Sequence, residues 1–112
     1  RKGGVRAAAV VEQRLTREQL LAELRKLRLE LESEGVTHLA LFGSRARADN
    51  KPDSDIDLII DIDETRKFSL LDLVGVSHTI GDRLELEANI VTRRSIEPEF
   101  ASEIQRDLIE VF

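Results

Sequence analysis

The sequence predicts an α/β fold of the α+β kind, in which a small mixed β-sheet packs against helices. The chain has 112 residues, enough for one domain with one modest hydrophobic core. Apolar residues recur with helical spacing in some segments and with a period of two in others. Together these patterns predict the order helix, strand, strand, helix, strand, helix.

The first helix is predicted over residues 17–34. Thr16 and Gln19 form a capping-box pattern at its start, and Gly35 suits the position just past its end. Leucines follow helical spacing between these signals, at positions 20, 21, 24, 27 and 31.

The segment before this helix has a different composition. Residues 1–15 are basic and then alanine-rich, without a clear period. We therefore expect a mobile or loosely attached segment over 1–15, followed by a single domain over 16–112.

Three strands are predicted from short apolar or alternating runs. Residues 36–42 form an apolar run that ends at Gly43. Residues 56–62 alternate, with apolar side chains on one face and mostly carboxylates on the other. Residues 84–91 also alternate, which predicts the third strand.

Two further helices complete the prediction. Ser69 and Asp72 mark the start of a helix expected to reach about Ile80 and to stop at Gly81. Pro98 suits the first turn of a last helix, expected to run to about Val111.

Composition excludes several classes of protein. The net charge of −5 disfavours binding to a nucleic-acid backbone, which needs a basic face. The absence of cysteine excludes disulfide scaffolds and thiolate metal sites, and is typical of a cytoplasmic protein. The longest apolar run, residues 7–11, is far shorter than the roughly 20 residues of a membrane helix. We therefore expect a cytoplasmic protein with no membrane contact and no direct nucleic-acid binding.

The chemistry of the sequence is concentrated around two aspartates. Asp55 and Asp57 lie two residues apart on the polar face of the predicted second strand, so both side chains point the same way. Carboxylates in this arrangement repel each other unless a divalent cation lies between them. Oxygen ligands without cysteine or a neighbouring histidine favour Mg²⁺, or Mn²⁺, over zinc.

A turn that suits phosphate precedes this pair. Gly43 lets the backbone approach an anion closely, and Ser44 offers a hydroxyl and free N–H groups. Arg45 follows with positive charge. Gly-Ser alone is common in turns, and two aspartates alone are common on a polar strand face. The combination is more specific, because phosphate and Mg²⁺ sites together are the equipment for nucleotidyl transfer.

This pattern resembles a known family. Gly43-Ser44 followed by Asp55 and Asp57, with apolar strands around both, is similar to the signature of the polymerase-β-type nucleotidyltransferase superfamily. The short chain resembles the minimal members of that group, over roughly Val36–Ser95. The resemblance implies the nucleotidyltransferase fold and Mg²⁺-dependent transfer of NMP, usually AMP from ATP. It also implies that Asp55 and Asp57 bind the metal and that Gly43 and Ser44 hold the triphosphate.

The resemblance also implies a partner. Minimal members are often antitoxins that bind a small, all-helical toxin of the HEPN type and adenylylate it. A protein hydroxyl is therefore the expected acceptor. The sequence leaves open whether the domain forms a homo-oligomer.

One position departs from the family pattern. A third carboxylate normally occupies the later strand, but here the position is Asn89. An amide oxygen can bind Mg²⁺ weakly but cannot accept a proton as a general base. Glu87, two residues earlier on the same predicted face, is the alternative. Glu87 and Asn89 are thus both candidate catalytic residues beside the aspartate pair.

Two functions follow from these alternatives. One is an enzyme that transfers AMP from Mg·ATP to a partner protein. The other is a catalytically weak or inactive antitoxin-like module that neutralises its partner by contact.

Overall fold

The computed structural model describes residues 15–112, and its centre is a mixed four-stranded sheet. The strand order is β3-β2-β1-β4. The neighbours β2 and β3 are parallel, whereas β1 is antiparallel to both β2 and β4. The strands are β1 (Val36–Phe42), β2 (Ile56–Ile62), β3 (Ala88–Thr92) and β4 (Ile109–Glu110). The predicted mixed sheet with helices is confirmed, and the first two strands have their predicted bounds.

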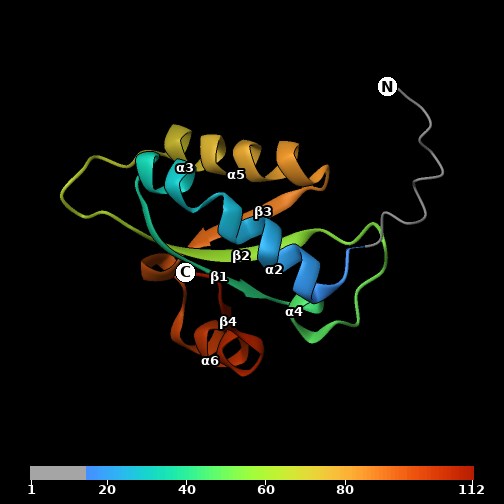
Figure 1. Ribbon diagram of the computed structural model, residues 1–112. Helices are drawn as coiled ribbons and strands as arrows, with labels where there is room; N and C mark the ends of the chain where they lie inside the picture. The colour runs from blue at the N-terminus through green and yellow to red at the C-terminus, as the bar shows by residue number, and fades with distance from the viewer. Residues whose placement is uncertain (1–14) are drawn as a thin grey trace.

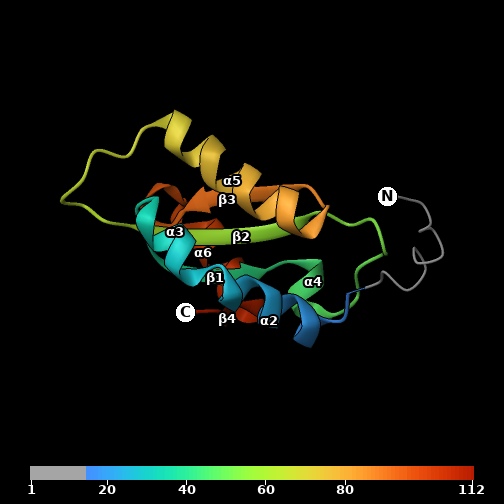
Figure 2. The ribbon, with the colours of Figure 1, turned by 45° about the horizontal axis from the view of Figure 1, so that its top comes forward.

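Helices cover the two faces of the sheet unequally. The helices α2 (Arg17–Lys26), α3 (Arg28–Ser33) and α5 (Leu70–Leu84) lie on one face, and α6 (Pro98–Asp107) lies on the other (Figures 1 and 2). The main core lies under the three helices, where the leucines of α2 and α3 meet the inward side chains of β1 and β2. Burial of this apolar surface is the main stabilising term of the fold.

Two short elements join the strands to the rest of the chain. The helix α4 (Ser44–Arg47) follows β1 after a single glycine, and the 3₁₀ helix η1 (Arg93–Ser95) follows β3 directly. No helix within residues 15–112 combines the length and the apolar character needed to cross a membrane.

The predicted first helix is interrupted. Its capping box at Thr16 and Gln19 is present, but the helix divides into α2 and α3 at Leu27. There the backbone N–H bonds to the carbonyl of Leu24, three residues back, which tightens the turn. This turn leaves Leu27 and Leu31 both buried in the core.

The helix predicted to stop at Gly81 continues to Leu84, and the third strand consequently starts at residue 88 rather than 84. The left-handed residue that ends α5 is Glu85, with φ 57°. Gly81 has another role, because a Cβ there would lie 2.9 Å from the carbonyl oxygen of Leu86. It lets the chain return closely over the helix end.

The last helix is also shorter than predicted. It ends at Asp107, because Leu108 is extended, and the chain then forms β4 instead of continuing to Val111. This strand pairs with the outer edge of β1, which satisfies backbone groups that an edge strand leaves open.

The segment over residues 1–15 lies outside the described residues except for Leu15, which packs against the core. The prediction that this segment is mobile or loosely attached to a single domain over 16–112 therefore stays a prediction.

Candidate functional site

The candidate site lies at one end of the sheet face that α6 covers only in part. The pairing of β1 with β2 aligns Phe42 with Asp57, and the pairing of β2 with β3 aligns Asp57 with Asn89. These three residues therefore form one cross-strand row. Ile59, the next residue of β2 on this face, lines a hollow against Ile104 of α6. The helix thus covers the middle of the face, while Asn89 and Asp55 stay exposed.

An amide joins the two aspartates. Nδ2 of Asn89 donates to Oδ2 of Asp55 at 3.1 Å and to Oδ1 of Asp57 at 3.3 Å. The structure thus brings three of the predicted site residues together. The donors offset part of the repulsion between the two carboxylates, because the amide hydrogens carry partial positive charge.

The residues of this cluster form an oxygen-rich set. Within residues 15–112 no group of three histidine, cysteine or acidic side chains is arranged to hold a metal ion. The cluster offers two carboxylates and, if the amide turns, one amide oxygen. Mg²⁺ is commonly bound by one or two carboxylates together with substrate phosphates. This donor set therefore fits Mg²⁺ that arrives with a nucleotide.

Gly43 allows the turn after β1 to lie directly against Asp57. Its φ is 80° and its ψ is −159°, a backbone region that is essentially restricted to glycine. A Cβ added there would collide with Oδ2 of Asp57 and lie 3.2 Å from its Cβ and Cγ. The predicted phosphate turn and the aspartate pair are therefore in contact.

Ser44 begins the short helix α4 beside this contact and is half-buried. Among the backbone hydrogen bonds that the described residues make in turns, loops and caps, the N–H groups of Ser44 and Arg45 donate none. Such first-turn N–H groups are available to an anion. The turn therefore has donors for a phosphate oxygen close to the carboxylates.

Arg45 is the buried charge of the site, with 2% of its surface exposed. Its Nε donates to the carbonyl of Ser54 at 3.0 Å, and its Nη2 donates to the carbonyl of Pro52 at 3.1 Å. Burial lowers the pKa of Arg45, while the charges of Asp53 and Asp55 act in the opposite direction. The guanidinium thus holds the loop that leads into the aspartate pair, a role that the sequence analysis missed.

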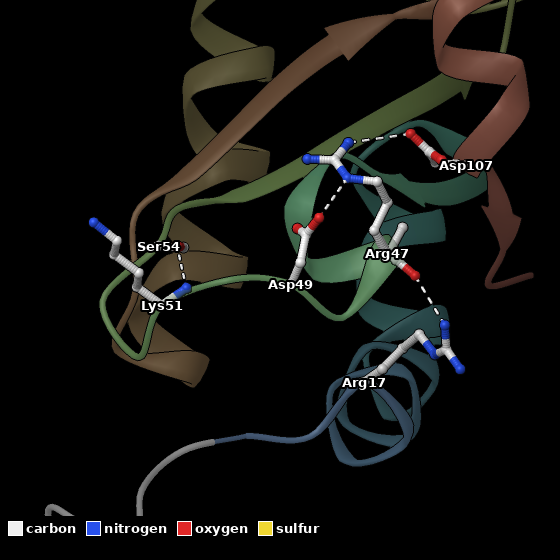
Figure 3. A network of polar contacts seen from close by, with 7 residues as sticks. Arg17, Arg47, Asp49, Lys51, Ser54 and Asp107 are labelled. Atoms are coloured by element: carbon white, nitrogen blue, oxygen red, sulfur yellow. Dashed lines mark hydrogen bonds and ion pairs between the residues drawn. The ribbon is translucent and has the colours of Figure 1, made fainter.

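A second arginine joins α4 to α6. Figure 3 shows Arg47 between Asp49 and Asp107, with distances of 3.0 and 3.1 Å. The same view shows Arg17 of α2 donating to the carbonyl of Ala46. These contacts hold the phosphate turn against helices on both faces of the sheet.

Glu87, the alternative third acid, lies just before β3. Its carbonyl accepts a hydrogen bond from the N–H of Ile56 at 2.9 Å. The residue is exposed and lines a hollow together with residues of α5, including Gly81 and Asp82. Among the described residues no three acidic side chains are grouped so as to hold a metal ion, so the structure does not bring Glu87 together with Asp55 and Asp57 as a third metal-binding carboxylate.

Comparison with known proteins places these features in a family. The model of the nucleotidyltransferase domain matches residues 23–111. A candidate protein adenylyltransferase of Methanocaldococcus jannaschii is 39% identical over 90 residues, which cover 79% of this chain and 90% of that protein. The protein adenylyltransferase MntA of Thermococcus cleftensis is 31% identical over 98 residues, covering 87% of this chain and 97% of MntA.

Solved structures show the same architecture. A candidate minimal nucleotidyltransferase has a TM-score of 0.68 and 31% identity, with 83% of this chain and 93% of that chain covered. A chain from a complex of the tri-AMPylated HEPN toxin and MNT antitoxin of Shewanella oneidensis has a TM-score of 0.62. Its 14% identity, over 86% of this chain and 71% of that chain, supports likeness of fold. With most of its length matched by the domain model, this chain belongs to the nucleotidyltransferase domain family.

Proposed function

We propose that this protein transfers AMP from Mg·ATP to a hydroxyl of a partner protein and acts as the antitoxin of a toxin–antitoxin pair. The observation that supports this most is the contact between the glycine turn and the aspartate pair. Gly43 lies against Asp57, and the side-chain amide of Asn89 donates hydrogen bonds to both Asp55 and Asp57. This arrangement supports adjacent positions for phosphate and for a divalent cation, as nucleotidyl transfer requires.

Each residue has a distinct role in this proposal. Asp55 and Asp57 are the ligands of Mg²⁺, or of Mn²⁺, and a bound cation would neutralise charge on the triphosphate. Gly43 and Ser44 bind phosphate oxygens through the open turn. Arg45 positions the loop before β2, because its donors are already bonded to that loop.

A protein acceptor is supported by the relatives. MntA of Thermococcus cleftensis is named a protein adenylyltransferase, and the toxin in the Shewanella oneidensis complex is tri-AMPylated. The net charge of −5 disfavours a nucleic-acid acceptor. We infer a small helical partner of the HEPN type, encountered in the cytoplasm.

Asn89 supports a second candidate function. It occupies the place where a third carboxylate would accept the proton of the acceptor, and an amide cannot do so. The absence of a group of three acidic side chains that could hold a metal ion within residues 15–112 supports the view that Glu87 does not replace this carboxylate. The alternative is therefore a weak or inactive module that binds nucleotide and neutralises its partner by contact.

Labelled transfer distinguishes the two functions. The protein is incubated with Mg²⁺, ATP labelled at the α-phosphate, and a small helical protein of the HEPN type. The enzyme hypothesis predicts that label moves to the partner and that Asp55→Asn/Asp57→Asn abolishes transfer while partner binding survives. Asp61→Asn is the matched control, because Asp61 is on the same strand face but bonds to Arg93. A double variant that still neutralises the toxin fully would favour the contact module.

A further inference from the structure

Two aromatic rings border the open end of the sheet face. Phe42 is the last residue of β1, directly before Gly43, and Phe100 is in the first turn of α6. Their ring centroids are 6.4 Å apart and the ring planes meet at 87°, an edge-to-face contact. Residues far apart in the sequence thus form one aromatic corner.

The corner is continuous with the aspartate cluster. Phe42 is the register partner of Asp57, and directly paired residues have Cβ atoms about 4.5–5.5 Å apart. Phe42 is half-buried, so its ring forms a fixed wall beside the carboxylates. The ring of Phe100 meets the ring of Phe42 edge to face and so adds to this aromatic surface.

Phe100 is exposed although it belongs to a helix that packs on the sheet. It is 46% exposed, although Ile104 of the same helix is only 5% exposed. The other two phenylalanines of the chain, Phe68 and Phe112, pack against the main core. Phe100 is therefore the phenylalanine of the described residues that is exposed, whereas Phe68 and Phe112 are partly buried.

Side-chain contacts join the helix that carries Phe100 to the segment around the phosphate turn. The ion pair between Arg47 and Asp107 joins α4 to α6 at 3.1 Å (Figure 3). Phe42 is covalently next to Gly43, and Phe100 packs on Phe42. A ligand whose phosphates bind at the turn would meet a preformed aromatic surface at one side.

We propose that Phe100, supported by Phe42, is the surface on which the base of the nucleoside triphosphate stacks. This inference rests on the proposed function, because it needs the phosphates to bind at Gly43 and Ser44. Nucleobases stack on aromatic side chains through their π-faces, which gives affinity with little sequence preference. The ring should therefore increase the affinity for nucleotides but not for polyphosphates that lack a base.

The first test uses a fluorescent reporter in place of the ring. The sequence has no tryptophan or tyrosine, so F100W gives one indole signal at this position. Mg·ATP is expected to quench this emission as it saturates. Mg·tripolyphosphate is expected to compete with ATP without quenching. Emission that is indifferent to saturating ATP would overturn the proposal.

The second test measures affinity by calorimetry. F100A is expected to bind Mg·ATP about tenfold more weakly, the size of effect typical of losing one stacked base. Its affinity for Mg·tripolyphosphate is expected to equal that of the wild type. L71A is the matched control, because Leu71 is 81% exposed on α5, across the sheet from α6.

The outcomes separate this inference from the proposed function. Unchanged ATP binding by F100A, including a case in which only partner binding weakens, would overturn the stacking role. Equal weakening toward ATP and tripolyphosphate would show that the ring supports the turn instead, and would also overturn it. If the wild type bound neither ligand, the proposed function would fail and the inference with it.

Discussion

Replacing Gly43 with alanine tests how closely the phosphate turn and the aspartate pair depend on each other. The φ of 80° and ψ of −159° at this position belong to a region that only glycine adopts without strain. The added Cβ would also collide with the carboxylate of Asp57. Either the backbone or Asp57 must therefore move.

The size of the effect follows from these two terms. Holding a non-glycine residue in this region costs about 1–3 kcal/mol of folding free energy. For a domain of this size, that corresponds to a fall in Tm of roughly 4–20 °C. Displacing Asp57 by even 1 Å would weaken a positioned reaction by about 100-fold. Nucleotide binding and transfer should therefore decrease together with stability.

The assay compares Gly43→Ala with Gly75→Ala in α5. A Cβ at Gly75 meets nothing within 4 Å, so the control adds only the helix preference of alanine, worth about 0.5–1 kcal/mol. Thermal unfolding should show a lower Tm for Gly43→Ala and a slightly higher Tm for Gly75→Ala. Calorimetry should show weaker Mg·ATP binding only for Gly43→Ala. Wild-type Tm and wild-type affinity in Gly43→Ala would refute the reasoning.

Three further variants test other parts of the site and the fold. Asn89→Asp replaces the bridging amide with a third carboxylate, which adds repulsion in the absence of metal. The Tm measured in EDTA should therefore fall, and the increase in Tm on adding Mg²⁺ should be larger than in the wild type. Labelled transfer should accelerate by about 10²–10⁴, because the new carboxylate can act as a general base. Arg45→Met keeps much of the buried volume but leaves the carbonyls of Pro52 and Ser54 without their donors. Urea titration should show that the free energy of unfolding falls by about 1–3 kcal/mol. Amide hydrogen exchange should become faster over residues 48–55. Thr65→Val removes the hydroxyl whose hydrogen bond is the main cause of the lowered pKa of Asp63, so carboxyl NMR should show that pKa rising toward its ordinary 3.8. A carboxyl group whose pKa is lowered in the folded state stabilises the fold at pH values above its ordinary pKa, and this stabilisation is lost as the pH falls through the folded pKa. The difference in free energy of unfolding between the wild type and Thr65→Val should therefore become smaller at acid pH.

Local signals predicted where the helices begin better than where they end. Thr16 and Ser69 cap their helices as the sequence indicates, because a capping box involves only residues within one turn. The ends depend on distant contacts. Gly81 resembles a helix stop in the sequence, but in the structure it allows the chain to pass close to the helix at Leu86. The strand β4 forms by pairing with the edge of β1, a contact between distant parts of the sequence. A strand of two residues has no detectable period.

The candidate site divides in the same way. Alternation places Asp55 and Asp57 on one strand face, and the family resemblance implied that Asn89 joins them from the later strand. The hydrogen bonds of Asn89 to both aspartates agree with that expectation. The role of Arg45 could not, since no sequence signal shows that two carbonyls of the following loop turn back onto it. Glu87 fits the alternation but precedes the first residue of β3, and among the described residues no three acidic side chains are grouped to hold a metal ion. The aromatic corner depends on how α6 packs, which the spacing of its residues does not reveal.

The measurement that tests the central claim most directly is a calorimetric titration of ATP with and without Mg²⁺. The wild type, Asp55→Asn/Asp57→Asn and the control Asp61→Asn are compared. A divalent-cation site between Asp55 and Asp57 predicts Mg²⁺-dependent binding in the wild type and the control, and its loss in the double variant. Absent binding, or binding indifferent to both Mg²⁺ and the double substitution, would contradict the claim that these carboxylates form a nucleotide–metal site.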